Sequence, residues 1–198
     1  SRMWIEDNNV TIGGDLDGGG ALGIRNTDNL TIEHIKISDN SIKVNGSVRG
    51  GAVFGTFGTW ESNLSDINIS ANNVSYWTLD RGGSVLGLSA SKYNRIEDIR
   101  ISRNRLSSEN WTITEEDAAI GLYSDSDYNN LSNSIFSDGK ANGIILQNYT
   151  SGKNPDNNRF RNIAISNASR HGILVMHFNT TGNIFDNVSI RNTSLAAV

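Results

Sequence analysis

Short segments in which apolar and polar residues alternate recur along the whole chain. The clearest copies are Ile35-Lys36-Ile37-Ser38, Ile67-Asn68-Ile69-Ser70 and Ile99-Arg100-Ile101-Ser102, which begin 32 residues apart, and Ile163-Ala164-Ile165-Ser166 is a looser one. Alternation with a period of two predicts strands that are buried on one face. Self-similarity at a spacing of this length predicts a solenoid, in which each repeat forms one rung of a stack.

A second apolar segment follows the first in each rung. Its copies are Leu22-Gly23-Ile24, Phe54-Gly55-Thr56, Leu86-Gly87-Leu88, Ile120-Gly121-Leu122, Ile144-Ile145-Leu146 and Ile173-Leu174-Val175. None of these segments has the 3.6-residue period of an amphipathic helix. We therefore predict an all-β solenoid of about seven rungs, with two strands in each rung.

Equivalent polar residues of successive rungs are expected to form columns parallel to the solenoid axis. One column consists of Ser38, Ser70, Ser102, Ser137 and Ser166, and a second of His34, Asp66, Asp98, Asn133, Asn162 and Asn187. Members of a column lie about 4.8 Å apart, so their side chains can hydrogen-bond along the axis. We expect these residues to have a structural rather than a catalytic role.

Composition narrows the classes of function. The 198 residues are 36% hydrophobic and contain no cysteine, which excludes disulfides and thiol chemistry. With a net charge of -4 and no run of 18 apolar residues, we expect neither a nucleic-acid partner nor insertion into a membrane. The length and the continuous repeat predict that residues 1–198 are a single β-helix domain. Neither end shows the polar cap of a solenoid. We therefore expect this domain to be part of a longer chain or to associate with itself along the axis.

The repeat resembles the right-handed parallel β-helix superfamily, which includes pectate lyases, polygalacturonases and proteins with NosD-type repeats. Residues 9–20 resemble the first rung of many such proteins, and the match covers nearly the whole chain. The resemblance implies a right-handed parallel β-helix. It also makes an acidic polysaccharide an expected substrate, because the best-known members act on such polymers, but a fold does not fix an activity.

Charged residues precede the second strand of four successive rungs and are predicted to form one column: Asp17, Arg49, Arg81 and Glu115. One interpretation is an exposed ladder of ion pairs. The other is a groove in which Arg49 and Arg81 bind a uronate, sulfate or phosphate group. Glycine pairs beside the arginines would leave the backbone open there.

In the second interpretation, the acidic residues next to the column act as general base or metal ligands. The candidate catalytic residues are therefore Arg81, Glu115, Glu116 and Asp117, with Arg49 as a substrate-binding residue. No metal site or cofactor is predicted otherwise, and calcium is expected only if the protein is a lyase.

Tryptophans lie in the long insertions that precede this column. Trp77 and Trp111 are candidate substrate-binding residues, because exposed aromatic rings beside charged groups stack on sugars. The alternative is that they fold over the outside of the helix and bury apolar surface. Trp60 lies in a loop on a different side of the rung.

Other chemical motifs are weak. His171 invites comparison with the Gly-His-Gly motif of polygalacturonases, but the acidic residues and the Arg-x-Lys that accompany this motif are missing, so we expect a corner residue. The sequence contains no nucleophile elbow, phosphate loop or zinc spacing.

Asn-x-Ser/Thr sequons occur in nearly every rung. A corner Asn, a core residue and an outward Ser or Thr produce this pattern mechanically, and the alternative is glycosylation. The best candidates lie in the long loops: Asn45, Asn73 and Asn110.

Two classes of function remain. The first is an extracellular or cell-surface module that serves as a structural or glycan-binding scaffold, with a polysaccharide or surface glycan as partner. The alternative is a polysaccharide lyase or glycoside hydrolase that acts on an acidic polysaccharide through the groove on rungs two to four.

Overall fold

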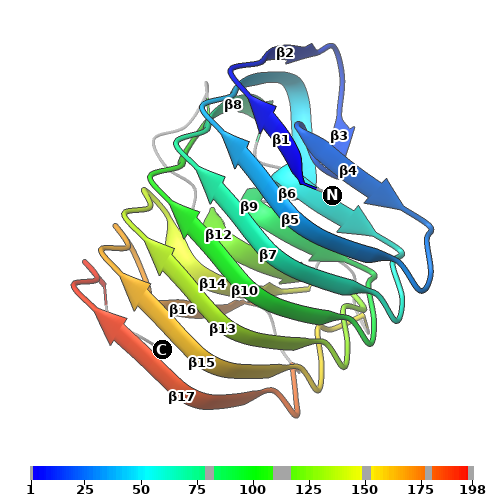
Figure 1. Cartoon of the computed structure of the whole chain (residues 1–198). Coiled ribbons are helices and arrows are strands. Elements are labelled where there is room, and N and C mark those ends of the chain that lie inside the picture. Colours follow the sequence, from blue (N-terminus) through cyan, green and yellow to red (C-terminus); the bar gives the residue numbers. More distant parts are fainter. Residues whose placement is uncertain (1, 79–82, 109–116, 149–152, 177–179, 196–198) are drawn as a thin grey trace.

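The computed structural model describes residues 2–78, 83–108, 117–148, 153–176 and 180–195, and every regular element in these ranges is a β-strand. Seven parallel strands form the first sheet (Figure 1). In spatial order they are β1 (Met3–Glu6), β5 (Thr31–Ser38), β7 (Asn63–Ser70), β10 (Arg95–Ser102), β13 (Asn130–Ser137), β15 (Arg159–Ser166) and β17 (Ile184–Arg191).

A second sheet of ten strands lies behind the first. Its main path is β11 (Arg105–Ser108), β8 (Asn73–Thr78), β6 (Ser41–Phe57), β9 (Gly83–Ser89), β12 (Ala118–Tyr123), β14 (Asn142–Gln147) and β16 (Ile173–Met176). Three short strands also pair with β6: β2 (Asn9–Ile12), β3 (Leu16–Asp17) and β4 (Leu22–Arg25). The long strand β6 joins two sides of the solenoid, because its first half pairs with β8 and its second half with β9.

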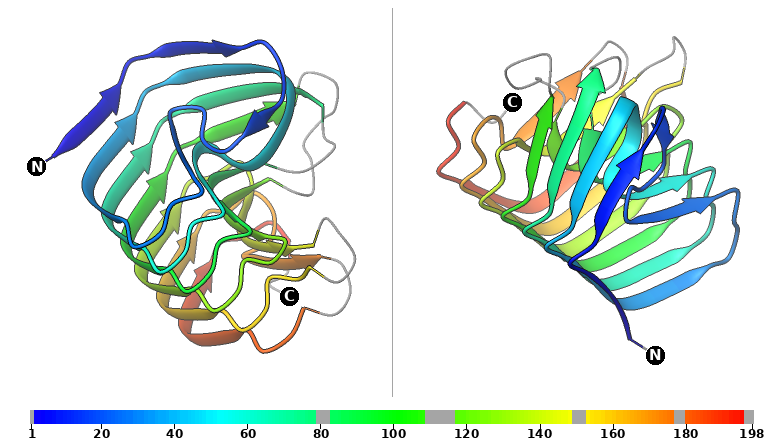
Figure 2. Two further views of the ribbon diagram at one scale, coloured as in Figure 1. Left: turned by 90° about the vertical axis from the view of Figure 1, so that its right-hand side faces the viewer. Right: turned by 90° about the horizontal axis from the view of Figure 1, so that it is seen from above.

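The turns wind right-handed and stack along one axis (Figures 1 and 2), which confirms the predicted parallel β-helix. The number of turns is about five rather than the predicted seven. The sequence estimate took every copy of the repeat as a full rung, whereas the copies at the two ends belong to incomplete turns. Among the described residues, for example, no strand of the second sheet follows β17.

The stacking register is the one that the repeat predicts. Ile35 pairs with Ile67, and Ile67 pairs with Ile99, so one buried isoleucine lies above the next. The large side chains Phe54, Phe136 and Phe160 are fully buried in the same interior. Burial of each such side chain contributes about 1.5–3 kcal/mol, so a thin stacked core is enough to hold the rungs together. The described part of the chain contains no helix long and apolar enough to cross a membrane.

Two asparagine ladders, buried except at the end residues Asn8 and Asn183, fix the corners of the solenoid. In the first, each side-chain amide donates to the side-chain oxygen of the next rung, from Asn8 to Asn40 (2.9 Å), Asn40 to Asn72 (2.8 Å) and Asn72 to Asn104 (2.9 Å). In the second, Asn94, Asn129, Asn158 and Asn183 are linked in the same way at 2.9–3.0 Å. These amides satisfy turn backbone groups that would otherwise be buried without partners.

The two predicted polar columns are both aligned in the structure. The register confirms the serine column, since Ser38 pairs with Ser70 and Ser70 with Ser102. The column that begins at His34 is also aligned and hydrogen-bonded along the axis, with Asn162 donating to Asn133 at 3.0 Å and Asn187 to Asn162 at 2.9 Å. It is exposed, and all of its members have a left-handed backbone with φ of 49–58°. His, Asp and Asn tolerate this conformation better than most residues, so the column marks a kink in each strand of the first sheet.

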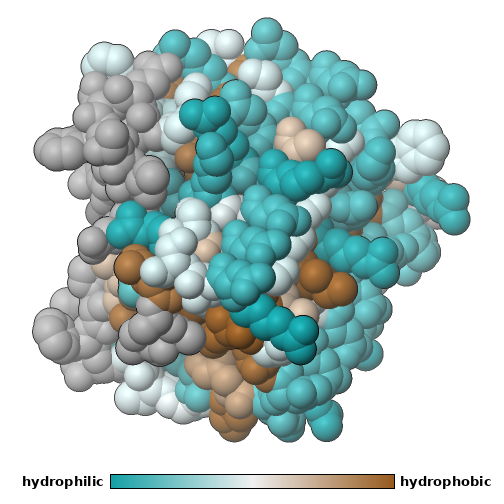
Figure 3. All heavy atoms as spheres, turned by 90° about the vertical axis from the view of Figure 1, so that its left-hand side faces the viewer, coloured by the Kyte–Doolittle hydropathy of each residue, from teal (hydrophilic) through white to brown (hydrophobic). Residues whose placement is uncertain are grey.

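The cross-section of the solenoid changes along the axis. The early turns have an extra side, formed by β2, the first half of β6, β8 and β11, whereas only residues 138–141 connect β13 to β14. Below β11 a small apolar cavity of about 20 Å³ is lined by residues that include Leu106, Phe136 and Ala141. Figure 3 shows this side of the molecule, with an apolar area in its lower half beside the grey atoms.

Candidate functional site

The structure describes only part of the predicted Arg/acid column. Asp17 and Arg49 are register partners between β3 and β6, as the stacking predicted. Arg81, Glu115 and Glu116 lie outside the described residues, as does Trp111. Their catalytic and binding roles therefore stay predictions.

Asp117 is described, and it is buried rather than presented at a surface. Its side chain is 1% exposed and accepts a hydrogen bond of 2.5 Å from the hydroxyl of Tyr76, which is buried as well. The side-chain amide of Asn142 donates to the Asp117 carbonyl oxygen at 2.8 Å. These contacts give Asp117 a clear structural role between β8 and β14, and its catalytic role stays a prediction.

The glycines beside Arg49 are explained by close backbone packing rather than by open backbone. Gly50 has φ of 81°, and both Gly50 and Gly51 are buried. A Cβ atom on Gly87 would lie 2.2 Å from the backbone nitrogen of Gly51, which is closer than any real contact. Glycine is therefore required where these turns touch.

The remaining predicted residues lie on β6, β8 and one corner. Trp77 is 51% exposed, so of the two interpretations of this tryptophan the structure favours an exposed ring. Asn45 and Asn73 are exposed, as glycosylation requires, while Asn110 lies outside the described residues. His171 is at a corner, where its backbone N–H donates to the side chain of Asn142 at 3.1 Å.

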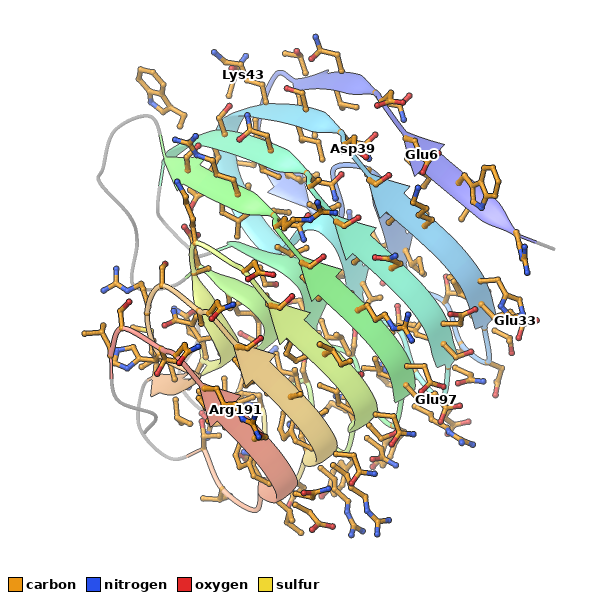
Figure 4. The ribbon with its side chains drawn as sticks, turned by 60° about the vertical axis from the view of Figure 1, so that its left-hand side comes forward. Glu6, Glu33, Asp39, Lys43, Glu97 and Arg191 are labelled. Carbon is orange, nitrogen blue, oxygen red and sulfur yellow. The ribbon has the colours of Figure 1, made fainter. Side chains whose placement is uncertain are left out.

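The outer face of the first sheet carries polar side chains and ion pairs (Figure 4). Lys36 pairs with Glu6, which also accepts a hydrogen bond of 3.0 Å from the hydroxyl of Ser38. The hydrogen bond from Lys36 lowers the pKa of Glu6, and the same bond raises the pKa of Lys36. Further along the sheet, Arg95 pairs with Glu97 at 2.8 Å. Exposed pairs of this kind contribute little to stability.

A group of exposed aromatic rings lies at the corner where the second sheet ends and the first begins. We call it the aromatic corner and define it by Trp60, Tyr93 and Tyr128, which are 50%, 54% and 50% exposed. The rings of Tyr93 and Tyr128 stack with centroids 5.0 Å apart and planes 7° from parallel. This corner is on the right-hand side of Figure 1 and faces the viewer in the left panel of Figure 2.

The turns of the aromatic corner have an unusual backbone for the residues they carry. Tyr93 and Tyr128 have φ of 58° and 56°, and Glu61 in the same column has φ of 50°. A left-handed backbone costs a bulky residue about 1–3 kcal/mol, whereas Asn or Gly adopts it more readily. Stacking of the two rings adds about 0.5–1.5 kcal/mol beyond the area it buries, which is of the same size as the backbone cost. Stability therefore gives little reason for tyrosine at these two positions, which is consistent with a role in binding.

The aromatic corner is held from below by the second asparagine ladder. Tyr93 is followed by the buried Asn94, and Tyr128 by the buried Asn129, whose side chains are hydrogen-bonded to each other at 2.9 Å. Because the ladder fixes the spacing of the turns, it also fixes the spacing of the rings. The indole N–H of Trp60 donates to the backbone carbonyl of Ala90 in the next rung at 3.4 Å.

The charges at this corner are mostly acidic. Lys92 pairs with Asp127 at 2.8 Å and with Asp125 at 3.5 Å. The hydrogen bond to Asp127 raises the pKa of Lys92, so its positive charge is matched by carboxylates from the next rung. Asp28 and Glu61 add two further exposed carboxylates beside Trp60. Arg25 is an exposed cation near the same hollow, 5.2 Å from the Phe57 ring, so the excess of carboxylates disfavours an anion without excluding one.

A shallow hollow adjoins Trp60. Its volume is about 320 Å³, and it is lined by Asn26, Asp28, Gly58, Trp60 and Ala90. It combines an apolar ring with amide and carboxylate groups that can hydrogen-bond to hydroxyls. Among the described residues no group of three or more His, Asp or Glu side chains is arranged to hold a metal ion.

Sequence reasoning noted Trp60 but missed the aromatic corner. Tyr93 follows Lys92 and Tyr128 follows Asp127, each in a turn. The spacing of 35 residues between the two tyrosines differs from the 32-residue spacing of the earlier rungs. The available signal was the buried Asn that follows each tyrosine, because aligning Asn94 with Asn129 places Tyr93 above Tyr128.

Comparison with known proteins gives only weak structural similarities. No protein-family model and no curated protein sequence matches the chain. Among solved structures, the chain is similar to the catalytic domain of a GH87 alpha-1,3-glucanase in complex with nigerose. The identity is 16% and the TM-score 0.40, over 87% of this chain and 46% of that one.

A variant of such a domain in complex with tetrasaccharides matches at 12% identity and a TM-score of 0.28, over 98% of this chain and 61% of that one. The chain thus spans less than two thirds of the structures it matches. At these values the likeness carries no argument about activity.

Proposed function

We propose that the chain is a carbohydrate-binding β-helix module of a secreted or cell-surface protein. The observation that carries this proposal is the exposure of large aromatic rings on a rigid frame: Trp60, Trp77, Tyr93 and Tyr128 are each at least half exposed. Tryptophan and tyrosine side chains are usually well buried, because leaving them in water forfeits much of their hydrophobic stabilisation. Sugar rings have an apolar C–H face that covers such side chains.

The β-helix supplies the rigidity that such a surface needs. Strand stacking holds equivalent residues of neighbouring rungs about 4.8 Å apart, and the asparagine ladders lock the corners between them. A binding surface that is fixed before the ligand arrives loses less conformational entropy on binding. The solenoid thereby acts as the scaffold and the aromatic side chains as the contact.

Charge favours a neutral polysaccharide over an acidic one. The chain has a net charge of -4, and the carboxylates around Trp60 oppose a polyanion. Glycosylation at Asn45 and Asn73 and association of copies along the axis stay predictions that belong to the same extracellular role.

A retention and cleavage assay tests the proposal. Purified protein is run through native gels that contain soluble neutral polysaccharides (hydroxyethylcellulose, xyloglucan or dextran) or polygalacturonate, and reducing ends are followed in parallel. We expect retardation by at least one neutral polymer and no new reducing ends. Unretarded migration in every gel would overturn the proposal. Cleavage that disappears in Asp117→Asn while the variant keeps the wild-type melting temperature would instead establish the lyase or hydrolase alternative.

A further inference from the structure

We propose that the aromatic corner is the subsite that binds a neutral glycan chain, with pyranose rings stacked on Tyr93 and Trp60. This inference rests on the proposed carbohydrate-binding function and assigns it to one surface. It also names the ligand class, a neutral hexopyranose polymer. Neither Tyr93 nor Tyr128 belongs to the surface that sequence reasoning marked for binding.

The orientation of the tyrosine rings defines where the first sugar lies. Because the two rings are nearly parallel and their centroids are about one rung apart, their planes lie across the solenoid axis. Tyr128 covers one face of Tyr93, so the other face of Tyr93 looks along the axis toward the rung of Trp60. On that rung the equivalent position is occupied by Glu61, which is exposed and not aromatic, so the stack of rings ends at Tyr93 and leaves a position for a sugar.

A pyranose ring matches this space. Its thickness is close to the rung spacing, so a sugar above Glu61 continues the stack of Tyr128 and Tyr93. The carboxylate of Glu61 is then at the edge of the sugar, where it can accept hydrogen bonds from hydroxyls. Carboxylates accept from neutral hydroxyl groups more strongly than neutral acceptors do.

Trp60 provides the second contact. Its bond to the Ala90 carbonyl holds the ring over the hollow that Asn26 and Asp28 also line. An apolar ring with a few polar groups around it is the usual composition of a small-molecule site. Trp60 pairs with Lys92, the residue before Tyr93, so the hollow lies on the rung next to that of Tyr93.

The charges at the aromatic corner select a neutral ligand. Lys92 is the cation nearest to Tyr93 in sequence, and it is engaged by Asp127 and Asp125. A uronate or sulfate would meet the carboxylates of Asp28 and Glu61, whose repulsion costs affinity. The corner therefore discriminates against the acidic polymers expected from the resemblance to pectate lyases.

Single substitutions locate the site. Tyr93→Asn removes the stacking ring and supplies a residue that suits the left-handed backbone, so the fold is retained. Trp60→Ala removes the second ring, and Trp4→Ala is the control, because Trp4 is also exposed but lies on β1, on a different side. Trp77→Ala tests the rival surface around the other exposed tryptophan. Gel retardation and calorimetry with the neutral polymer that retains the wild-type protein give the dissociation constants.

We expect Tyr93→Asn and Trp60→Ala to weaken binding at least 10-fold with an unchanged melting temperature, and Trp4→Ala to change the dissociation constant less than 2-fold. Trp60→Phe should recover most of the loss. If Trp77→Ala abolishes binding while the corner variants bind normally, the corner is wrong and the carbohydrate-binding function stands. If the wild-type protein binds no neutral polymer, both fail. Tighter binding of polygalacturonate at the corner would overturn the neutral ligand class.

Discussion

The two sides of one corner differ in what their side chains do. On the inside, Asn94 and Asn129 are buried, fully hydrogen-bonded and in contact with the next rung. On the outside, the residues directly before them, Tyr93 and Tyr128, are half exposed and hold an unfavourable backbone. Adjacent positions of the same turn are thus assigned to stability and to binding. A solenoid can separate these roles because each rung repeats the frame while the outward side chain is free to change.

The largest expected loss of stability comes from a substitution on the inside of the corner. The Asn94 side chain accepts from the Ser62 backbone N–H at 3.0 Å and donates to the Thr59 carbonyl at 2.9 Å. In Asn94→Ala these buried groups lose their partner, and we expect a loss of about 3 kcal/mol in the free energy of unfolding. Urea denaturation measures it, and Asn73→Ala, at an exposed asparagine, should change stability by less than about 0.5 kcal/mol. Equal effects of the two variants would contradict a structural ladder.

A substitution on the outside of the corner should change the free energy of unfolding less, and should not lower it. Tyr93→Asn loses ring stacking but relieves the left-handed backbone, so the free energy of unfolding should rise or stay within about 0.5 kcal/mol of the wild type. Thermal unfolding measures this directly. A loss of 2 kcal/mol or more would show that the stacked rings are part of the structural frame.

The smallest effect concerns the Lys92 pair. The contact with Asp127 raises the pKa of Lys92 in the folded protein, so the pair stabilises the fold below the unfolded pKa of lysine, about 10.4. This contribution is lost as pH rises through the raised pKa. Wild type should exceed Lys92→Met by less than about 1 kcal/mol at pH 7, and the difference should shrink above about pH 10.5. A difference that grows with pH would contradict the sign.

The sequence was sufficient for the fold because the period-two pattern and the 32-residue repeat specify strand, register and stacking together. It was less informative about which polar column faces inward. The column at His34 does form hydrogen bonds along the axis as predicted, but it is exposed. The buried ladder runs through Asn40, Asn72 and Asn104, which are part of the repeat itself. Period-two alternation assumes an extended backbone, so it cannot tell whether a residue faces the interior of the solenoid where the backbone is left-handed.

The aromatic corner was harder to predict for a related reason. Stacking of Tyr93 on Tyr128 depends on turns of different length being aligned by their buried asparagines. The Arg/acid column shows the converse case, since register paired Asp17 with Arg49 as expected while Asp117, next to the predicted column, lies buried against Tyr76. Neighbouring positions in a rung can face opposite directions, and a one-residue difference decides which side chain meets a ligand.

The most direct test is the fluorescence of Trp60 alone. In a protein with Trp4, Trp77 and Trp111 changed to Phe, the emission of Trp60 is followed during titration with the neutral polysaccharide that retains the wild type. A sugar on the indole face removes water from it, so we predict a saturable blue shift that Tyr93→Asn weakens at least 10-fold. An unchanged Trp60 spectrum, together with a saturable shift in the reciprocal protein that keeps only Trp77, would contradict binding at the aromatic corner.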